Sequence, residues 1–105
     1  DNWPRFLTAV NNLTVDKENT LVLLPGDFLA PSLLSSLDHA RGMIDCMNRC
    51  KFNYVCFGNH ECDIPHAELI NRIKESNFKW INSNMTNIDL GDIKLPEYET
   101  ITVKG

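Results

Sequence analysis

Polar residues in two short segments have the types that a hydrolytic metal site needs. Asp27 follows Pro25-Gly26, and Asn59 stands next to His60 much further along the chain. Carboxylate and amide oxygens bind hard or borderline divalent ions, and one Asp can bridge two such ions about 3.5–4 Å apart. Asp27 is therefore a candidate bridging ligand and Asn59 a candidate second ligand. Pro-Gly-Asp by itself is also an ordinary turn sequence, so the assignment depends on both segments.

His60 and Asp63 are candidates for acid–base chemistry. They lie three residues apart at the entry to an expected helix, so the carboxylate can accept the proton of the imidazole. That contact fixes the ring tautomer and stabilises the protonated form, as a general acid or a stabiliser of developing charge requires. In the alternative, Asp63 caps the helix that opens at Pro65 and the backbone satisfies His60. The two roles are compatible.

Both polar segments follow apolar runs that are typical of strands. Residues 21–24 form a continuous apolar run, and residues 52–57 form a second run that ends at Gly58. A third strand is expected over residues 78–81. Continuous apolar runs fit parallel strands buried on both faces, and ligands bind at the carboxyl ends of such strands. The polar segments therefore stand where a site is expected.

Helical periodicity separates these runs. Short helices are expected over residues 4–13 and 65–77, and a long helix over residues 33–50 with Ser32 as its N-cap. The apolar residues expected on the inner face of the long helix are Leu33, Leu34, Leu37, Ala40, Ile44 and Met47. Strands that alternate with helices predict an α/β fold, with a βαβαβ parallel sheet.

Composition excludes several classes of protein. The 105 residues carry a formal net charge of −4 and no run of Lys or Arg, which argues against a nucleic-acid-binding patch. No apolar run approaches the roughly 20 residues that cross a bilayer. The glycine motifs that bind nucleotide phosphates are absent.

Cysteine usage favours reduced thiols. Cys46 and Cys50 fall within a helical pattern and Cys56 within a strand pattern, where free cysteine acts as a small apolar residue. The alternatives are disulfides that also include Cys62, and a structural zinc site, for which no second close pair is present. Unpaired thiols favour an intracellular location, although the sequence leaves localisation open.

Other potential sites carry less information. His39 and His66 fall within expected helices, where a solvated helix face is the simpler interpretation than a metal ligand. The triplets Asn12-Leu13-Thr14 and Asn84-Met85-Thr86 match the glycosylation sequon, which has meaning only in a secreted chain.

The spacing of the two segments resembles a known family. Gly26-Asp27 followed by Gly58-Asn59-His60-Glu61 resembles the second and third motifs of the metallophosphoesterases, the calcineurin-like superfamily. The continuation through Cys62-Asp63 and residues 78–84 is similar to the N-terminal domain of the 5′-nucleotidases and their cyclic-nucleotide phosphodiesterase relatives. The resemblance covers about residues 5–103 and implies part of an α/β/β/α sandwich.

The resemblance implies a role for each candidate residue. Asp27 would bridge two divalent ions, for which Mn, Zn, Fe and Mg are the candidates, and Asn59 would bind one of them near the substrate phosphate. His60 would stabilise the transition state or protonate the leaving group, and Asp63 would orient His60.

Two motifs of the family have no counterpart. Residues 1–26 contain no His for an Asp-x-His motif, and no Gly-His-x-His follows His66. The chain begins at Asp1 without Met and ends directly after residues 98–103, which alternate like a strand. We therefore expect residues 1–105 to be a partial metallophosphoesterase domain, with the other metal ligands supplied by the remainder of the same polypeptide.

The leading hypothesis is a fragment of a two-metal phosphoesterase, inactive when isolated, whose parent acts on phosphate esters and is 5′-nucleotidase-like, with nucleotides among its candidate substrates. The alternative is a non-catalytic α/β module that regulates or binds another protein. The missing motifs separate the two, since their presence in the full-length chain would favour the enzyme.

Overall fold

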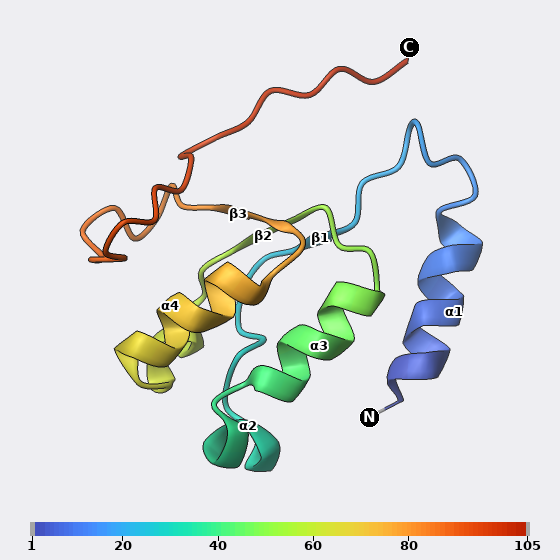
Figure 1. The fold of residues 1–105 in the computed structure, drawn as a ribbon. Helices are drawn as coiled ribbons and strands as arrows, with labels where there is room; N and C mark the ends of the chain where they lie inside the picture. The colour runs from blue at the N-terminus through green and yellow to red at the C-terminus, as the bar shows by residue number, and fades with distance from the viewer. Residues whose placement is uncertain (1, 105) are drawn as a thin grey trace.

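A three-stranded parallel sheet forms the centre of the computed structural model, which describes residues 2–104. The strands lie in chain order, β1 (Leu23–Leu24), β2 (Tyr54–Cys56) and β3 (Lys79–Ile81) (Figure 1). Val55 pairs with Leu24 on one side and with Trp80 on the other. Helices connect successive strands, as parallel pairing requires. The α/β fold and the βαβαβ order expected from the sequence are confirmed.

Helices cover one face of the sheet. α2 (Leu33–Asp38) and α3 (Arg41–Arg49) connect β1 to β2, and α4 (His66–Glu75) connects β2 to β3 (Figure 1). α1 (Trp3–Leu13) precedes β1, and the short 3₁₀ helix η1 (Asn59–Asp63) follows β2. Within residues 2–104, none of the helices has the length and apolar character needed to cross a membrane.

The core lies between the sheet and the helices, and its aromatic part reaches the ends of the strands. The ring centroid of Trp80 lies 5.2 Å from that of Phe28 and 5.0 Å from that of Phe57. Phe28 follows Asp27, and Phe57 precedes Gly58, so both polar segments start from buried, packed residues. Packing of this kind holds the adjoining loops in fixed positions.

The long helix expected over residues 33–50 is wrong, because the structure divides it into α2 and α3. His39 and Ala40 both adopt left-handed backbone conformations, with φ of 52° and 64°, which a continuous helix does not allow. Asp38 then accepts a hydrogen bond from the backbone N–H of Gly42 at 2.8 Å and so stabilises the first turn of α3. Ser32 caps α2 as expected, through the N–H of Ser35 at 2.9 Å.

This break changes which residues reach the core. Ala40, Ile44 and Met47 are buried as expected. Leu33 and Leu37 of α2 are exposed, as is Leu34, because the break ends α2 and gives it a different direction from α3 (Figure 1). The expectation that these three residues lie on the inner face of the helix is therefore wrong.

The strands are shorter and less buried than the sequence predicts. The apolar run 21–24 contributes two residues to β1, and Leu23 keeps 60% of its surface exposed. The expectation that this strand is buried on both faces is therefore wrong: β1 is at the edge of the sheet, and the helices cover one face. In contrast, Val55 on the central strand β2 and Trp80 on β3, at the other edge of the sheet, are buried.

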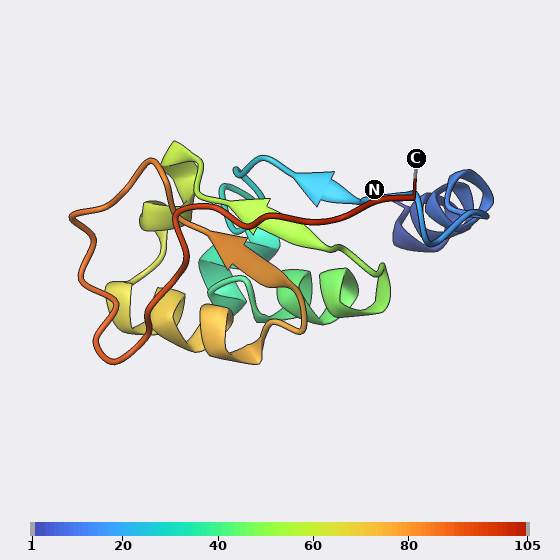
Figure 2. The same ribbon diagram turned by 90° about the horizontal axis from the view of Figure 1, so that it is seen from above.

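The last part of the chain is extended and passes over the face of the sheet opposite the helices (Figures 1 and 2). Pro96 accepts a hydrogen bond from the N–H of Asn82 at 2.8 Å, and Lys79 pairs with Glu99 at 2.5 Å. The N–H of Lys104 donates to the side chain of Asn19 at 3.1 Å. Residues 98–103 are extended but belong to no strand, so the strand expected there is wrong for this chain.

The four cysteines are free thiols, as expected. Cys50 is buried at the end of α3, and this burial raises the pKa of its thiol. Cys62 is exposed on η1.

Candidate functional site

The polar loops after β1 and β2 touch at the carboxyl edge of the sheet, because parallel neighbouring strands end at the same edge. The first loop turns at Gly26, with φ of 93°, and at Asp27, with φ of 59°. A Cβ on Gly26 would collide with the backbone nitrogen of Gly58. Glycine is therefore required at Gly26 both for its backbone conformation and for the close approach of the two loops.

Asp27 projects from the first loop onto the second. Its Oδ1 accepts a hydrogen bond from the backbone N–H of His60 at 3.1 Å. A Cβ on Gly58 would occupy the position of this carboxylate, so the absence of a side chain at Gly58 makes room for it. The side chain of Asp27 remains exposed. The structure thus brings Asp27 beside the segment that carries Asn59, as the sequence predicts.

His60 and Asp63 form the side-chain pair that their spacing suggests. His60 Nδ1 lies 2.6 Å from Asp63 Oδ2, and both side chains are partly exposed. The hydrogen bond to Asp63 raises the pKa of the His60 imidazole above its ordinary value, and the negative charges of Asp63, Asp27 and Glu61 act in the same direction. This pair favours the imidazolium form.

The alternative role of Asp63 as a helix cap is wrong in this structure. α4 begins at His66 with Pro65 at its N-cap position, and no side chain caps it. Asp63 is instead the last residue of η1, and its carboxylate binds His60.

The position of Glu61 in the sequence did not reveal its role. Its side chain is fully buried, with 0% of its surface exposed. Oε1 accepts hydrogen bonds from the N–H groups of Phe28 (2.8 Å) and Leu29 (3.2 Å). Oε2 accepts from those of Asp27 (2.9 Å) and Gly58 (2.5 Å). Glu61 stands three residues after Gly58, the spacing of a capping box, and that signal could have suggested a backbone contact.

Asn84 is a second residue whose position the sequence did not reveal. Its Nδ2 donates a hydrogen bond at 2.8 Å to the backbone oxygen of Phe57, directly before the second loop. The segment after β3 therefore also supports the end of β2.

The remaining histidines lie elsewhere. His39 ends α2, where its backbone oxygen accepts a hydrogen bond from Arg72 at 3.1 Å, and His66 begins α4. Within residues 2–104, no three His, Cys, Asp or Glu side chains are grouped so that they could hold a metal ion. The oxygens of Asp27 and Asn59 suit hard divalent ions in type and exposure, but they make an incomplete ligand set.

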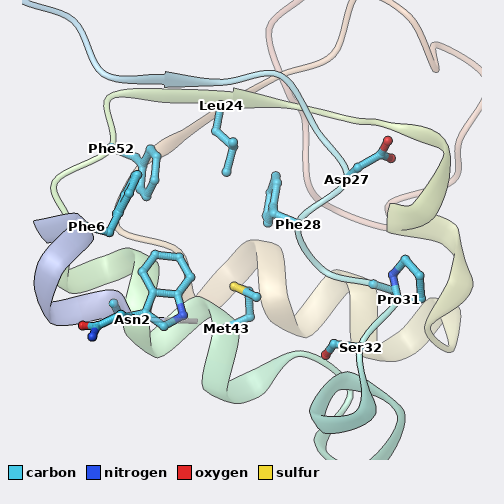
Figure 3. Close-up of a pocket in the computed structure, with 11 residues that line it drawn as sticks. Asn2, Phe6, Leu24, Asp27, Phe28, Pro31, Ser32, Met43 and Phe52 are labelled. Carbon is cyan, nitrogen blue, oxygen red and sulfur yellow. The ribbon is translucent and has the colours of Figure 1, made fainter. Parts of the chain in front are cut away.

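A mostly apolar pocket of about 470 Å³ lies on the other side of the first loop (Figure 3). Its walls include Phe6, Phe28, Met43 and Phe52. Asp27 is at its edge, but its carboxylate points away from the aromatic side chains. The pocket and the exposed carboxylate therefore face different directions.

Comparison with known proteins gives one match. The family model described as calcineurin-like phosphoesterase matches residues 1–105. No curated protein matches the chain, and no solved structure matches it.

Proposed function

The chain belongs to the calcineurin-like phosphoesterase family, and from this premise we propose that the two polar loops are one part of a two-metal site that hydrolyses phosphate esters. The family acts on phosphate esters and generally uses divalent metal ions. The observation that carries the proposal is the contact between the loops, in which Asp27 lies against Gly58 and accepts the N–H of His60. A carboxylate in that position can bind a metal ion that Asn59 also binds.

Each residue has a role in this proposal. Asp27 would be the carboxylate shared by the two ions, and Asn59 would hold one of them through its amide oxygen. When bound, the ions supply positive charge for the transferring phosphoryl group and an activated water. His60 donates a proton to the leaving group or stabilises the charge that develops there. Asp63 holds the imidazole by its Nδ1, which leaves Nε2 free to face substrate.

Residues 1–105 then form a partial domain that carries the second and third motifs of the family. At least three protein ligands per ion are usual in catalytic sites, so the remainder of the same polypeptide supplies the other ligands. For that reason the 105-residue chain alone binds Mn²⁺ or Zn²⁺ weakly and hydrolyses no phosphate ester. The substrate is a small phosphate ester, and the similarity of residues 58–63 and 78–84 to the nucleotidases favours a 5′-nucleotide.

The test compares Asp27→Ala with His60→Ala in the full-length polypeptide. Asp27→Ala abolishes stoichiometric metal loading and turnover together. His60→Ala keeps the metal and slows turnover by about 10² to 10⁴, the usual effect of one general acid or charge stabiliser. Metal content is measured by mass spectrometry, and turnover with p-nitrophenyl phosphate and with a 5′-nucleotide.

Asp92→Ala is the matched control, because it removes an exposed carboxylate that pairs only loosely with Lys74, at 3.4 Å. It leaves loading and turnover unchanged. If His60→Ala lost metal as completely as Asp27→Ala, His60 would be a ligand and not the acid. A full-length protein without turnover or metal would favour the non-catalytic module instead.

A further inference from the structure

A buried carboxylate joins the two loops of the candidate site. Glu61 reaches from η1 back under the first loop and accepts backbone hydrogen bonds from Asp27, Phe28 and Leu29, as well as from Gly58 at the start of its own loop. We propose that Glu61 is the positioning residue that holds the Asp27 carboxylate in place for metal binding. This inference rests on the proposed function, since it concerns the same site.

The first loop offers its N–H groups to Glu61, and within residues 2–104 they have no other acceptor. Phe28 and Leu29 are buried, with 8% and 0% of their surfaces exposed, so water cannot readily replace the carboxylate. A buried N–H that loses its acceptor costs about 1–3 kcal/mol. Three consecutive N–H groups that converge on one anion form a backbone nest of the kind that binds phosphate in other proteins.

In this chain the nest is already filled by the protein's own carboxylate. The N–H groups of residues 27–29 are therefore not free to bind the phosphate of a substrate. Phosphate must instead be held from the exposed side of the loops, where Asp27, Asn59 and His60 lie. The buried side of the loops has a purely positioning role.

One oxygen of Glu61 controls the orientation of Asp27. Oε2 accepts the N–H of Asp27 and the N–H of Gly58 together, so it fixes the two backbone segments on either side of the Asp27 carboxylate. Asp27 has a left-handed backbone, which is unfavourable for a residue with a side chain. The hydrogen bond from its N–H to Glu61 stabilises that conformation, and the conformation directs the carboxylate toward His60.

Glu61→Gln is the sharpest variant, because it replaces one acceptor oxygen by an NH₂ group at nearly constant shape. Two of the four N–H groups then face a donor. Glu68→Gln is the matched control, since it makes the same change on α4, where the carboxylate of Glu68 pairs with Arg72 at 3.4 Å.

The experiment is a Mn²⁺ titration of the ¹⁵N-labelled chain followed by NMR, which detects weak binding through broadening of nearby amide signals. In the wild-type chain, Mn²⁺ broadens the signals of Asp27, Asn59 and His60, and the N–H groups of Asp27, Phe28, Leu29 and Gly58 exchange slowly with solvent. Glu61→Gln weakens the Mn²⁺ affinity about 10- to 100-fold, as expected for a residue that orients a ligand. Glu68→Gln changes neither the Mn²⁺ affinity nor the exchange of these N–H groups.

The outcomes separate the two proposals. If Mn²⁺ leaves the wild-type signals of Asp27 and Asn59 unchanged, the proposed function is wrong and the role of Glu61 in metal binding is overturned with it. If the wild-type chain responds and folded Glu61→Gln responds with the same affinity, the positioning proposal alone is overturned.

If Glu61→Gln does not fold, Glu61→Asp takes its place, because it keeps both acceptor oxygens but is one methylene shorter. Folded Glu61→Asp with wild-type affinity, or fast exchange of the four wild-type N–H groups, also overturns the proposal.

Discussion

Two charged side chains are buried in the described part of the chain, residues 2–104, and they are stabilised in different ways. Glu61 has 0% of its surface exposed and Arg72 has 1%. Every hydrogen bond that Glu61 accepts comes from the backbone. Arg72 pairs with the side chains of Glu68 at 3.4 Å and Glu75 at 2.8 Å, and donates to the backbone oxygen of His39.

The difference lies in what each residue joins. Glu61 connects the ends of two strands, where a shift of the backbone would move Asp27. The side chain of Arg72 contacts two residues of its own helix and the turn between α2 and α3. Arg72 therefore stabilises the helical layer, whereas Glu61 sets the geometry of the candidate site.

The largest effect is expected from Gly26→Ala, which forces the two loops apart. Alanine in the left-handed backbone conformation of Gly26 costs about 1–2 kcal/mol. The collision of its Cβ with the backbone of Gly58 adds about 1–3 kcal/mol of overpacking. We expect the free energy of unfolding, measured by urea denaturation, to fall by about 2–5 kcal/mol, the sum of these two costs.

Gly91→Ala is the matched control for that change. Gly91 also has a positive φ, of 66°, but a Cβ there meets no atom within 4 Å. Gly91→Ala therefore loses only the backbone contribution of about 1–2 kcal/mol. Equal losses of unfolding free energy for Gly26→Ala and Gly91→Ala would mean that the close approach of the two loops does not contribute to stability.

Arg72→Leu should destabilise the chain without moving the site. Removal of one partner of a buried pair costs about 3–5 kcal/mol, and the lower end applies because Glu68 and Glu75 are partly exposed. We expect a loss of about 3 kcal/mol in urea denaturation, with unchanged NMR signals for Asp27 and Gly58. Shifts at those two signals would contradict the separation between the helical layer and the loops.

The contrast between the loops and the helical layer also shows what sequence can predict. The positions of the loops followed from apolar runs that end in polar residues, because strand ends are local features. The break at His39 and Ala40 could not be predicted, since neither residue is Gly or Pro, the residues that signal such a break in a sequence.

The role of Glu61 was hidden for a different reason. Three of its partners, Asp27, Phe28 and Leu29, lie more than thirty residues away in the sequence and come close only when β1 pairs with β2. The pair of His60 with Asp63 is local, and its spacing predicted it.

A smaller effect is expected from Asn84→Ala, which extends the comparison to the support of the second loop. The variant removes the hydrogen bond from Nδ2 to the backbone oxygen of Phe57. The expected loss in unfolding free energy is about 1 kcal/mol, the usual net value of one hydrogen bond, with an NMR shift at Gly58. Thr86→Ala disrupts the same sequon without touching this bond, so it should show neither change. Equal effects of the two variants would exclude a role for the bond.

The smallest effect on stability is expected from Asp63→Asn. This variant separates the two roles in the second loop, where Glu61 holds the backbone and Asp63 acts on the protonation of His60. Asp63 and His60 are both partly exposed, and Asp63 caps no helix, so little stability depends on their contact. Its effect is on protonation. The hydrogen bond to Asp63 raises the pKa of His60, and the charge of Asp63 adds to it. Asn removes that charge, so the pKa of His60 falls toward its ordinary value.

The sign of the pH dependence follows from that raised pKa. A raised pKa favours the folded chain at low pH, and this contribution is lost as the pH rises through the pKa of folded His60. In Asp63→Asn, less stability is lost as the pH rises, because the pKa of His60 is raised less. The imidazolium also loses its proton at lower pH, so the alkaline limb of turnover in the full-length protein moves to lower pH. An NMR titration of the His60 ring measures the shift directly, with His66 of the same chain as the internal reference. An unchanged His60 titration together with a large drop in melting temperature would make Asp63 a structural residue and leave His60 to act without it.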